Sequence, residues 1–119
     1  MNKYLITGGA GFIGSSVVRT LINSGNCKVL NIDALTYAGN LENLSSVDSN
    51  ENYLFQKINI TDIDEVERVI QQFEPDFIMH LAAESHVDRS IDDPSIFIQT
   101  NIIGTYNILE ATRKYLRSV

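Results

Sequence analysis

Thr7-Gly-Gly-Ala-Gly-Phe-Ile-Gly14 is the stretch that decides the fold of this chain. It follows a short apolar run at 4–6 and opens a helical pattern of apolar residues at 13–22, so it predicts the turn from a first strand into a first helix. Its glycines Gly8, Gly11 and Gly14 suit, in that order, a tight turn, a close approach of backbone to a ligand, and close packing of helix on sheet. The N–H groups of such a helix start can hold a pyrophosphate.

Asp33 gives the glycine pattern its context. A glycine turn alone is explained equally well by a backbone that needs positive φ, but Asp33 ends the next apolar strand at about the 20-residue spacing typical of dinucleotide sites. A carboxylate there accepts hydrogen bonds from the adenosine ribose hydroxyls, and its charge repels a 2′-phosphate. The pattern therefore predicts NAD rather than NADP as the cofactor.

Composition narrows the class of protein. With 119 residues the chain is one domain, small for a complete two-substrate enzyme, and its net charge of −6 disfavours nucleic acid or an anionic membrane as a partner. The single cysteine, Cys27, cannot form an internal disulfide, and the start of the chain has no leader pattern. No apolar run approaches the roughly 20 residues of a membrane span. We expect a cytoplasmic protein.

Strands and helices alternate along the predicted chain. Strands are expected at 3–7, 29–33, 53–58 and 77–83, and helices at 12–24, 61–73 and 93–117. The continuous apolar run at 77–83 is typical of a central parallel strand buried on both faces. Thr61, with Asp64 three residues later, is the expected cap of the second helix, and Asp93 with Pro94 is expected to begin the last one.

This alternation predicts an α/β fold, a partial Rossmann-type doubly wound parallel sheet of about four strands in the order 3-2-1-4. The chain direction reverses between strands one and four. Ligands of such sheets bind in the crevice at that point, which here lies between Thr7 and the pair Leu81 and Ala82. The segment 34–52 has at most a helical turn or two and is a candidate binding loop.

Three stretches of the sequence resemble those of a known family, and the resemblance extends over the whole chain. The glycine stretch resembles the opening of extended short-chain dehydrogenase/reductases. The stretches Asp33-Ala-Leu-Thr-Tyr-Ala-Gly-Asn-Leu-Glu42 and His80-Leu-Ala-Ala-Glu-Ser-His-Val-Asp-Arg-Ser90 resemble the nucleotide-sugar dehydratases within that family. The resemblance implies tightly bound NAD and the removal of water from a sugar nucleotide.

The resemblance also implies a cofactor site drawn from several parts of the chain. Asn59 stands where the family usually carries an Asp that binds the adenine amino group, and Ser85 also faces the sugar nucleotide. The residues implied to bind the cofactor are Gly8, Gly11, Phe12, Ile13, Gly14, Asp33, Ala34, Leu35, Thr36, Asn59, Ile60, Leu81, Ala82, Ala83, Glu84, Ser85 and Thr100.

Other polar residues have simpler interpretations. His80, inside an apolar run, is expected to be a core histidine with its hydrogen bonds satisfied. Tyr53 and Lys57 have the Tyr-x-x-x-Lys spacing of the superfamily's catalytic pair but fall in a predicted strand, whereas the family's pair lies on a helix downstream of residue 119. The cluster in 86–89 is expected to shape the mouth of the pocket, and we predict no metal site and no catalytic set in this chain.

We therefore expect residues 1–119 to be the NAD-binding domain of a nucleotide-sugar dehydratase, inactive alone, with its catalytic half absent. Two alternatives remain: a stand-alone, non-catalytic nucleotide-binding or interaction module, and another NAD-dependent sugar-nucleotide epimerase or decarboxylase. The expected helix at 94–117 has more apolar positions than one face of a helix can bury on the sheet, so it predicts a homo-oligomer formed through that helix.

Overall fold

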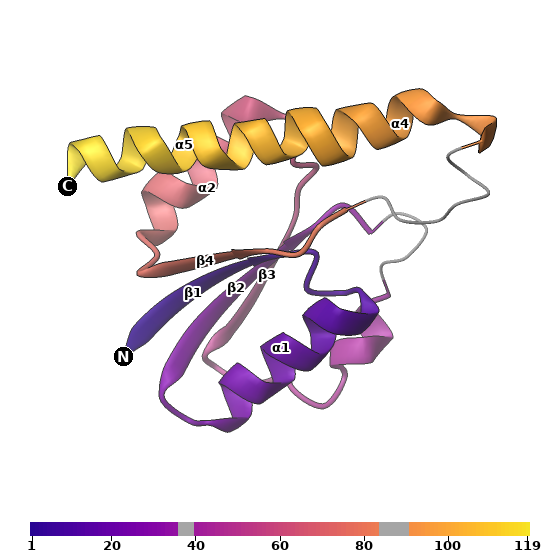
Figure 1. The fold of residues 1–119 in the computed structure, drawn as a ribbon. Coiled ribbons are helices and arrows are strands. Elements are labelled where there is room, and N and C mark those ends of the chain that lie inside the picture. Colours follow the sequence, from indigo (N-terminus) through magenta and orange to yellow (C-terminus); the bar gives the residue numbers. More distant parts are fainter. Residues whose placement is uncertain (36–39, 84–90) are drawn as a thin grey trace.

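A parallel four-stranded sheet forms the centre of the computed structural model, which describes residues 1–35, 40–83 and 91–119 (Figure 1). The strands lie in the order β3-β2-β1-β4, which confirms the predicted order and fold class. Their bounds are β1 Asn2–Thr7, β2 Cys27–Asp33, β3 Tyr53–Lys57 and β4 Phe77–His80.

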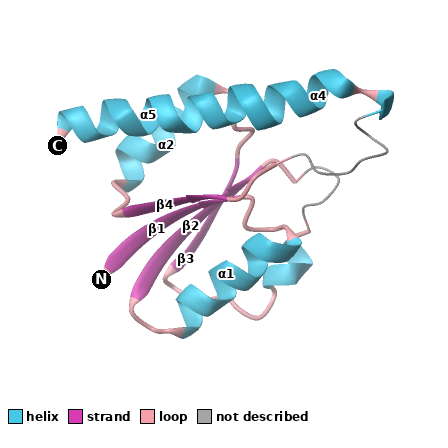
Figure 2. Cartoon of the chain, viewed as in Figure 1, coloured by secondary structure: helices cyan, strands magenta, loops and turns pink. Residues whose placement is uncertain are grey.

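Helices cover both faces of the sheet (Figure 2). One face carries α1 and the short 3₁₀ helix η1, and the other carries α2 and the long helical run that ends in α5. The bounds are α1 Phe12–Asn23, η1 Leu41–Leu44, α2 Ile63–Phe73, α4 Pro94–Ile98, η2 Gln99–Gly104 and α5 Thr105–Ser118. No helix in these described parts is both long and apolar enough to cross a membrane.

Alternate residues of the strands feed two hydrophobic cores, since successive side chains of a strand point to opposite faces. Leu5 and Leu30 pack with α2 and α5, whereas Ile6 and Val29 pack with α1 and η1. All four are nearly or fully buried. The two cores hold the helical layers against the two faces of the sheet.

Helix ends follow the sequence signals with one correction. Gly25 has φ +76 just after α1, as expected of the glycine that ends a helix. The N-cap of α2 is Asp62, whose Oδ1 accepts a hydrogen bond from Glu65 N at 3.3 Å, so the predicted cap at Thr61 was wrong by one residue. Thr61 instead donates to the side chain of Asn59.

Two further predictions are corrected by the last third of the fold. β4 is an edge strand of four residues in the described sheet, and Phe77 is 48% exposed, so the run at 77–83 is neither a seven-residue strand nor buried on both faces. The last helix is interrupted by the π-helical segment η2, and such π segments recur at functional sites. Asp93 does sit at the N-cap before Pro94, but its carboxylate accepts from Ser95 Oγ at 2.6 Å.

Candidate nucleotide-binding site

The turn between β1 and α1 needs glycine at Gly8, Gly9 and Gly14 for reasons within the protein. A Cβ on Gly9 would lie 2.3 Å from Oδ1 of the buried Asn31. Gly8 has φ +73, and a Cβ atom there would lie 2.7 Å from Ala82 Cα. A Cβ on Gly14 would lie 2.1 Å from the Gly8 carbonyl oxygen. The first glycine therefore makes the turn and lets β4 approach, and the third lets the start of α1 close onto that turn.

Gly11 is different. Its φ of −76° is open to any residue, and a Cβ there would meet no protein atom closer than 3.4 Å. Protein packing therefore does not require glycine at this position. A ligand bound against the backbone at the N-cap of α1 would require it, which is the fit expected for a pyrophosphate.

The start of α1 is also suited to an anion. Gly11 provides no side-chain cap, and the first turn carries no acidic residue. The first N–H groups of the helix and the positive end of its dipole therefore face outward without a competing carboxylate. Phe12 and Ile13 are 90% and 67% exposed beside them.

Asp33 lies against this turn, as the sequence predicts. Its Oδ2 accepts from Ala10 N at 3.0 Å and its Oδ1 from Leu35 N at 2.7 Å, and the residue is 9% exposed. Each carboxylate oxygen keeps a further lone pair for another donor. Leu35 has φ +56, a conformation that the bond to Asp33 stabilises. Asp33 thus joins the glycine turn to the start of the 34–52 segment.

Asn31 is a residue of the site that the sequence analysis missed. It is fully buried on β2, where its Oδ1 accepts from Gly9 N at 2.9 Å and its Nδ2 donates to Tyr53 Oη at 3.2 Å. Burial raises the pKa of Tyr53, and the hydrogen bond from Asn31 opposes that shift. An Asn inside the apolar run Val29-Leu-Asn-Ile32 was the available signal, because a buried amide needs partners.

Leu81 and Ala82 meet the glycine turn from the other side, as predicted for the crevice. Leu81 N donates to Thr7 O at 3.1 Å, and both Leu81 N and Ala82 N lie 3.0 Å from Thr7 Oγ1. His80 is satisfied on both ring nitrogens, by Thr7 Oγ1 at 2.7 Å and Thr105 Oγ1 at 2.9 Å. This confirms the interpretation of His80 as a satisfied histidine.

The remaining candidate residues are placed less directly. Asn59 Oδ1 already accepts from Thr61 N at 3.0 Å and Thr61 Oγ1 at 2.8 Å, so both its lone pairs are used. Ile60 is 5% exposed and packs against Gly104, so its side chain belongs to the core. Thr100 is half-buried in η2, and Ala34 and Ala83 follow β2 and β4. Thr36, Glu84, Ser85 and the cluster at 86–89 lie outside the described residues.

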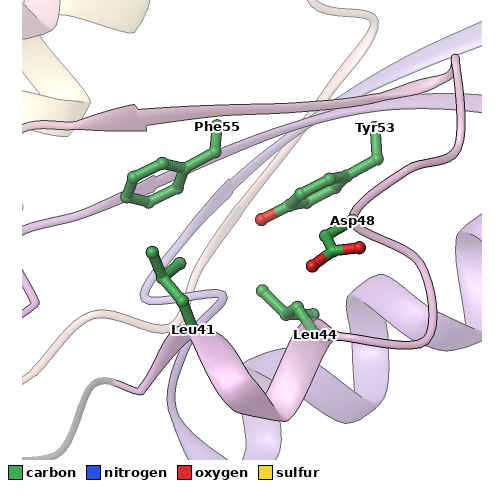
Figure 3. A pocket seen from close by; sticks show the side chains of 5 residues that line it. All are labelled: Leu41, Leu44, Asp48, Tyr53 and Phe55. Carbon is green, nitrogen blue, oxygen red and sulfur yellow. The ribbon is translucent and has the colours of Figure 1, made fainter.

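A pocket of about 260 Å³ lies elsewhere, between η1 and β3 (Figure 3). Leu41, Leu44, Tyr53 and Phe55 point into it, and Asp48 lies at its rim. It lies on the sheet face that α1 and η1 cover, at the edge strand β3 and away from the β1–β4 crevice. Tyr53 and Lys57 are the first and last residues of β3, which confirms that this Tyr-x-x-x-Lys spacing falls in a strand.

The fold and the glycine turn define a protein of the doubly wound, nucleotide-binding α/β class. The sequence profile described as GDP-mannose 4,6 dehydratase matches residues 5–118, and the chain belongs to that family. This confirms the resemblance to nucleotide-sugar dehydratases.

Three known proteins illustrate the similarity. The dTDP-glucose 4,6-dehydratase of Neisseria meningitidis serogroup B is 58% identical over 115 residues, which are 97% of this chain and 32% of that protein. The crystal structure of dTDP-glucose 4,6-dehydratase from Bacillus anthracis in complex with NAD superposes with a TM-score of 0.84 at 41% identity, covering 97% of this chain and 34% of that one. A UDP-glucose 4-epimerase from Thermus thermophilus, also in complex with NAD, gives 0.82 at 36% identity, covering 95% and 34%. The chain spans about a third of the length of these proteins.

Proposed function

We propose that residues 1–119 are the NAD-binding part of a dTDP-glucose 4,6-dehydratase, which converts dTDP-glucose to dTDP-4-keto-6-deoxyglucose and water. The proposal rests on two features that lie at the same turn. The N-terminus of α1 has no side-chain cap, and Asp33 is joined to the turn before it by the hydrogen bond from Ala10 N. The similarity to NAD complexes of this class supports it. When bound, NAD would accept the hydride that leaves the sugar.

In this proposal each part of the chain has a distinct binding task. The amides of Phe12 and Ile13 hold the pyrophosphate, and Asp33 binds the adenosine ribose together with Ala34, Leu35 and Thr36. Gly11 gives the pyrophosphate access to the backbone, and Gly8 and Gly14 allow the tight turn that presents it. The other residues assigned to the cofactor are Asn59, Ile60, Leu81, Ala82, Ala83, Glu84, Ser85 and Thr100, and Ser85 also contacts the sugar nucleotide.

Asn59 refines this assignment. Its oxygen is occupied by Thr61, so a contact with the adenine amino group requires that Thr61 release one of its two bonds. An amide also lacks the charge that strengthens the bond from a donor. We infer a weaker hold on the adenine than a carboxylate at this position would give.

The catalytic residues lie outside residues 1–119 in this proposal. The described chain offers no general acid and base within reach of one reacting centre, and Tyr53 and Lys57 are held in β3. Catalysis of dehydration would then need the part of the enzyme that this chain does not span. We place the enzyme in the cytoplasm, where the buried free thiol of Cys27 stays reduced.

Calorimetry tests the cofactor assignment. Titration of the 119-residue chain with NAD should give binding, and titration with NADP should give weaker binding because Asp33 repels the 2′-phosphate. The absence of heat with NAD would contradict the proposal. Turnover assays with dTDP-glucose and UDP-glucose on the protein encoded by the complete reading frame test the activity: water loss from dTDP-glucose supports it, and epimerisation of UDP-glucose would favour the epimerase alternative.

We also propose self-association through the helical layer of α4, η2 and α5. Large apolar side chains of this layer are 45% exposed or more, which is more than a surface helix usually presents. They are Ile98, Ile102, Ile103, Tyr106, Leu109 and Leu116. Sedimentation velocity should show a dimer that Leu109→Glu dissociates, and a monomer at all concentrations would contradict the proposal.

A further inference from the structure

Thr7 and His80 are partners in the register of β1 and β4, and their side chains meet on the face that α5 covers. Three groups surround the Thr7 hydroxyl: Leu81 N, Ala82 N and His80 Nδ1. The two backbone N–H groups can only donate, so they occupy both lone pairs of the hydroxyl oxygen. The hydroxyl proton is then left for the Nδ1 atom of His80.

This count of donors fixes the state of the histidine ring. Nδ1 accepts the proton of Thr7, so it carries none of its own. We infer a neutral ring with its proton on Nε2, which lies 2.9 Å from Thr105 Oγ1 and would donate to it. A continuous chain of hydrogen bonds therefore runs from Leu81 and Ala82 through Thr7 and His80 to α5.

The position of Ala82 depends on this series of hydrogen bonds. Ala82 passes so close to the glycine turn that a Cβ on Gly8 would lie 2.7 Å from Ala82 Cα. Ala82 N has its bond to Thr7 Oγ1, whereas Leu81 N also bonds to Thr7 O. If Nδ1 gained a proton, the Thr7 oxygen would have three donors for two lone pairs and would have to release one of the amides.

We propose that His80, as the neutral tautomer protonated on Nε2, is a positioning residue that holds Leu81 and Ala82 against Gly8 through the Thr7 hydroxyl and so sets the geometry of the nucleotide crevice. The inference rests on the proposed function for its ligand. His80 touches no part of the ligand site itself. It acts through Thr7, and Thr105 orients its ring from α5.

The ionisable groups of the elements packed against His80 are paired with other residues or lie in exposed or half-buried positions. Lys3 on β1 lies over the ring of Phe73, 5.7 Å from its centroid, and Asp76 before β4 accepts from Lys3 N. On α5, Glu110 pairs with Arg113, and Lys114 pairs with Glu67 of α2. Tyr115 of α5 is half-buried, and Tyr106 and Arg117 are exposed. Burial lowers the pKa of His80, in agreement with a neutral ring.

NAD titrations of the 119-residue chain between about pH 8 and about pH 5.5 test the inference. Wild-type affinity should fall by about tenfold as His80 becomes charged, which corresponds to the loss of one buried hydrogen bond. Thr7→Val, which has no hydroxyl, should weaken binding by a similar factor at the upper pH, and Thr7→Ser should restore it. His80→Asn keeps an acceptor near the Nδ1 position but cannot titrate, so its affinity should lose the pH dependence.

A control variant and a direct measurement of the tautomer complete the test. Thr112→Val removes a hydroxyl that bonds to Ile108 O within α5, and it should leave NAD binding unchanged. Nitrogen-15 shifts of the His80 ring at the upper pH should report the tautomer protonated on Nε2. A charged ring or the Nδ1–H tautomer would overturn the inference, as would pH-independent NAD binding with Thr7→Val equal to wild type. No NAD binding by the wild type at any pH would instead overturn the proposed function, and the inference with it.

Discussion

Asp33 Oδ2 accepts a hydrogen bond from Ala10 N at 3.0 Å, and this contact joins the end of β2 to the glycine turn. The same carboxylate binds Leu35 N through its other oxygen. One side chain thus organises the turn and the start of the next loop while it keeps lone pairs for a ligand. The contact makes Asp33 the first position at which the account can be tested.

Asp33→Asn should reduce NAD affinity by about 10- to 100-fold, because hydrogen bonds to a charged group contribute more than those to a neutral one. The preference for NAD over NADP should also shrink, since the charge that repels a 2′-phosphate is gone. Calorimetry with both cofactors measures this. Asp48→Asn, in the pocket between η1 and β3, is the matched control and should bind NAD as the wild type does. Equal losses in both variants would count against a ribose site at Asp33.

Gly14→Ala should lower the free energy of unfolding by about 1–3 kcal/mol, because its Cβ would lie 2.1 Å from the backbone oxygen of Gly8 and the turn must shift. Gly11→Ala meets nothing closer than 3.4 Å, so it should fold normally and lose NAD affinity. Urea unfolding and calorimetry on both variants separate the two effects. A stable Gly14→Ala, or a Gly11→Ala that binds NAD normally, would contradict these assignments.

Asn31→Leu should destabilise the fold by about 1–3 kcal/mol, since it leaves the buried Gly9 N–H without an acceptor. Tyr53→Phe removes only the partner of the Asn31 amide nitrogen and should cost less. Urea unfolding of the two variants checks the order. If Tyr53→Phe were the more damaging change, the main task of Asn31 would be to hold Tyr53 rather than the glycine turn.

Stability should fall as the pH drops below about 6.5, the ordinary pKa of histidine. The pKa of His80 lies below that value in the folded chain because burial disfavours the charged ring. Between the two pKa values the unfolded chain therefore binds more protons than the folded one, so protons favour unfolding. Urea unfolding at a series of pH values should show this decline in the wild type and a smaller one in His80→Asn. Identical slopes would show that His80 does not titrate as the structure requires.

Most of the fold could be predicted because its signals are local. Local patterns predict the individual elements: the glycine stretch predicts the turn into α1, the apolar run predicts β2, and the helical period predicts α2. The alternation of strand and helix then predicts the order of the strands in the sheet. The edge position of β4 follows from the predicted strand order, whereas the length of β4 and the exposure of Phe77 were missed, because an apolar run predicts burial but does not show where a strand ends.

The positions of candidate site residues could be predicted only where the residue type and its spacing indicate a single role. Asp33 and Gly8 lie where the pattern puts them. Asn31 was missed because its partners, Gly9 N and Tyr53 Oη, come together only when β1, β2 and β3 are aligned. The cap at Asp62 and the π segment η2 depend on backbone geometry. Neighbouring residues such as Thr61 and Asp62 have similar propensities, so the sequence alone does not show which of them is the cap.

The central claim is that a dinucleotide lies across the N-terminus of α1, and amide chemical shifts during an NAD titration test it most directly. The amides of Phe12 and Ile13 should move together and saturate with the calorimetric affinity, because their N–H groups meet the pyrophosphate. Shifts confined to the pocket of Leu41, Leu44 and Phe55, with the start of α1 unchanged, would contradict the account.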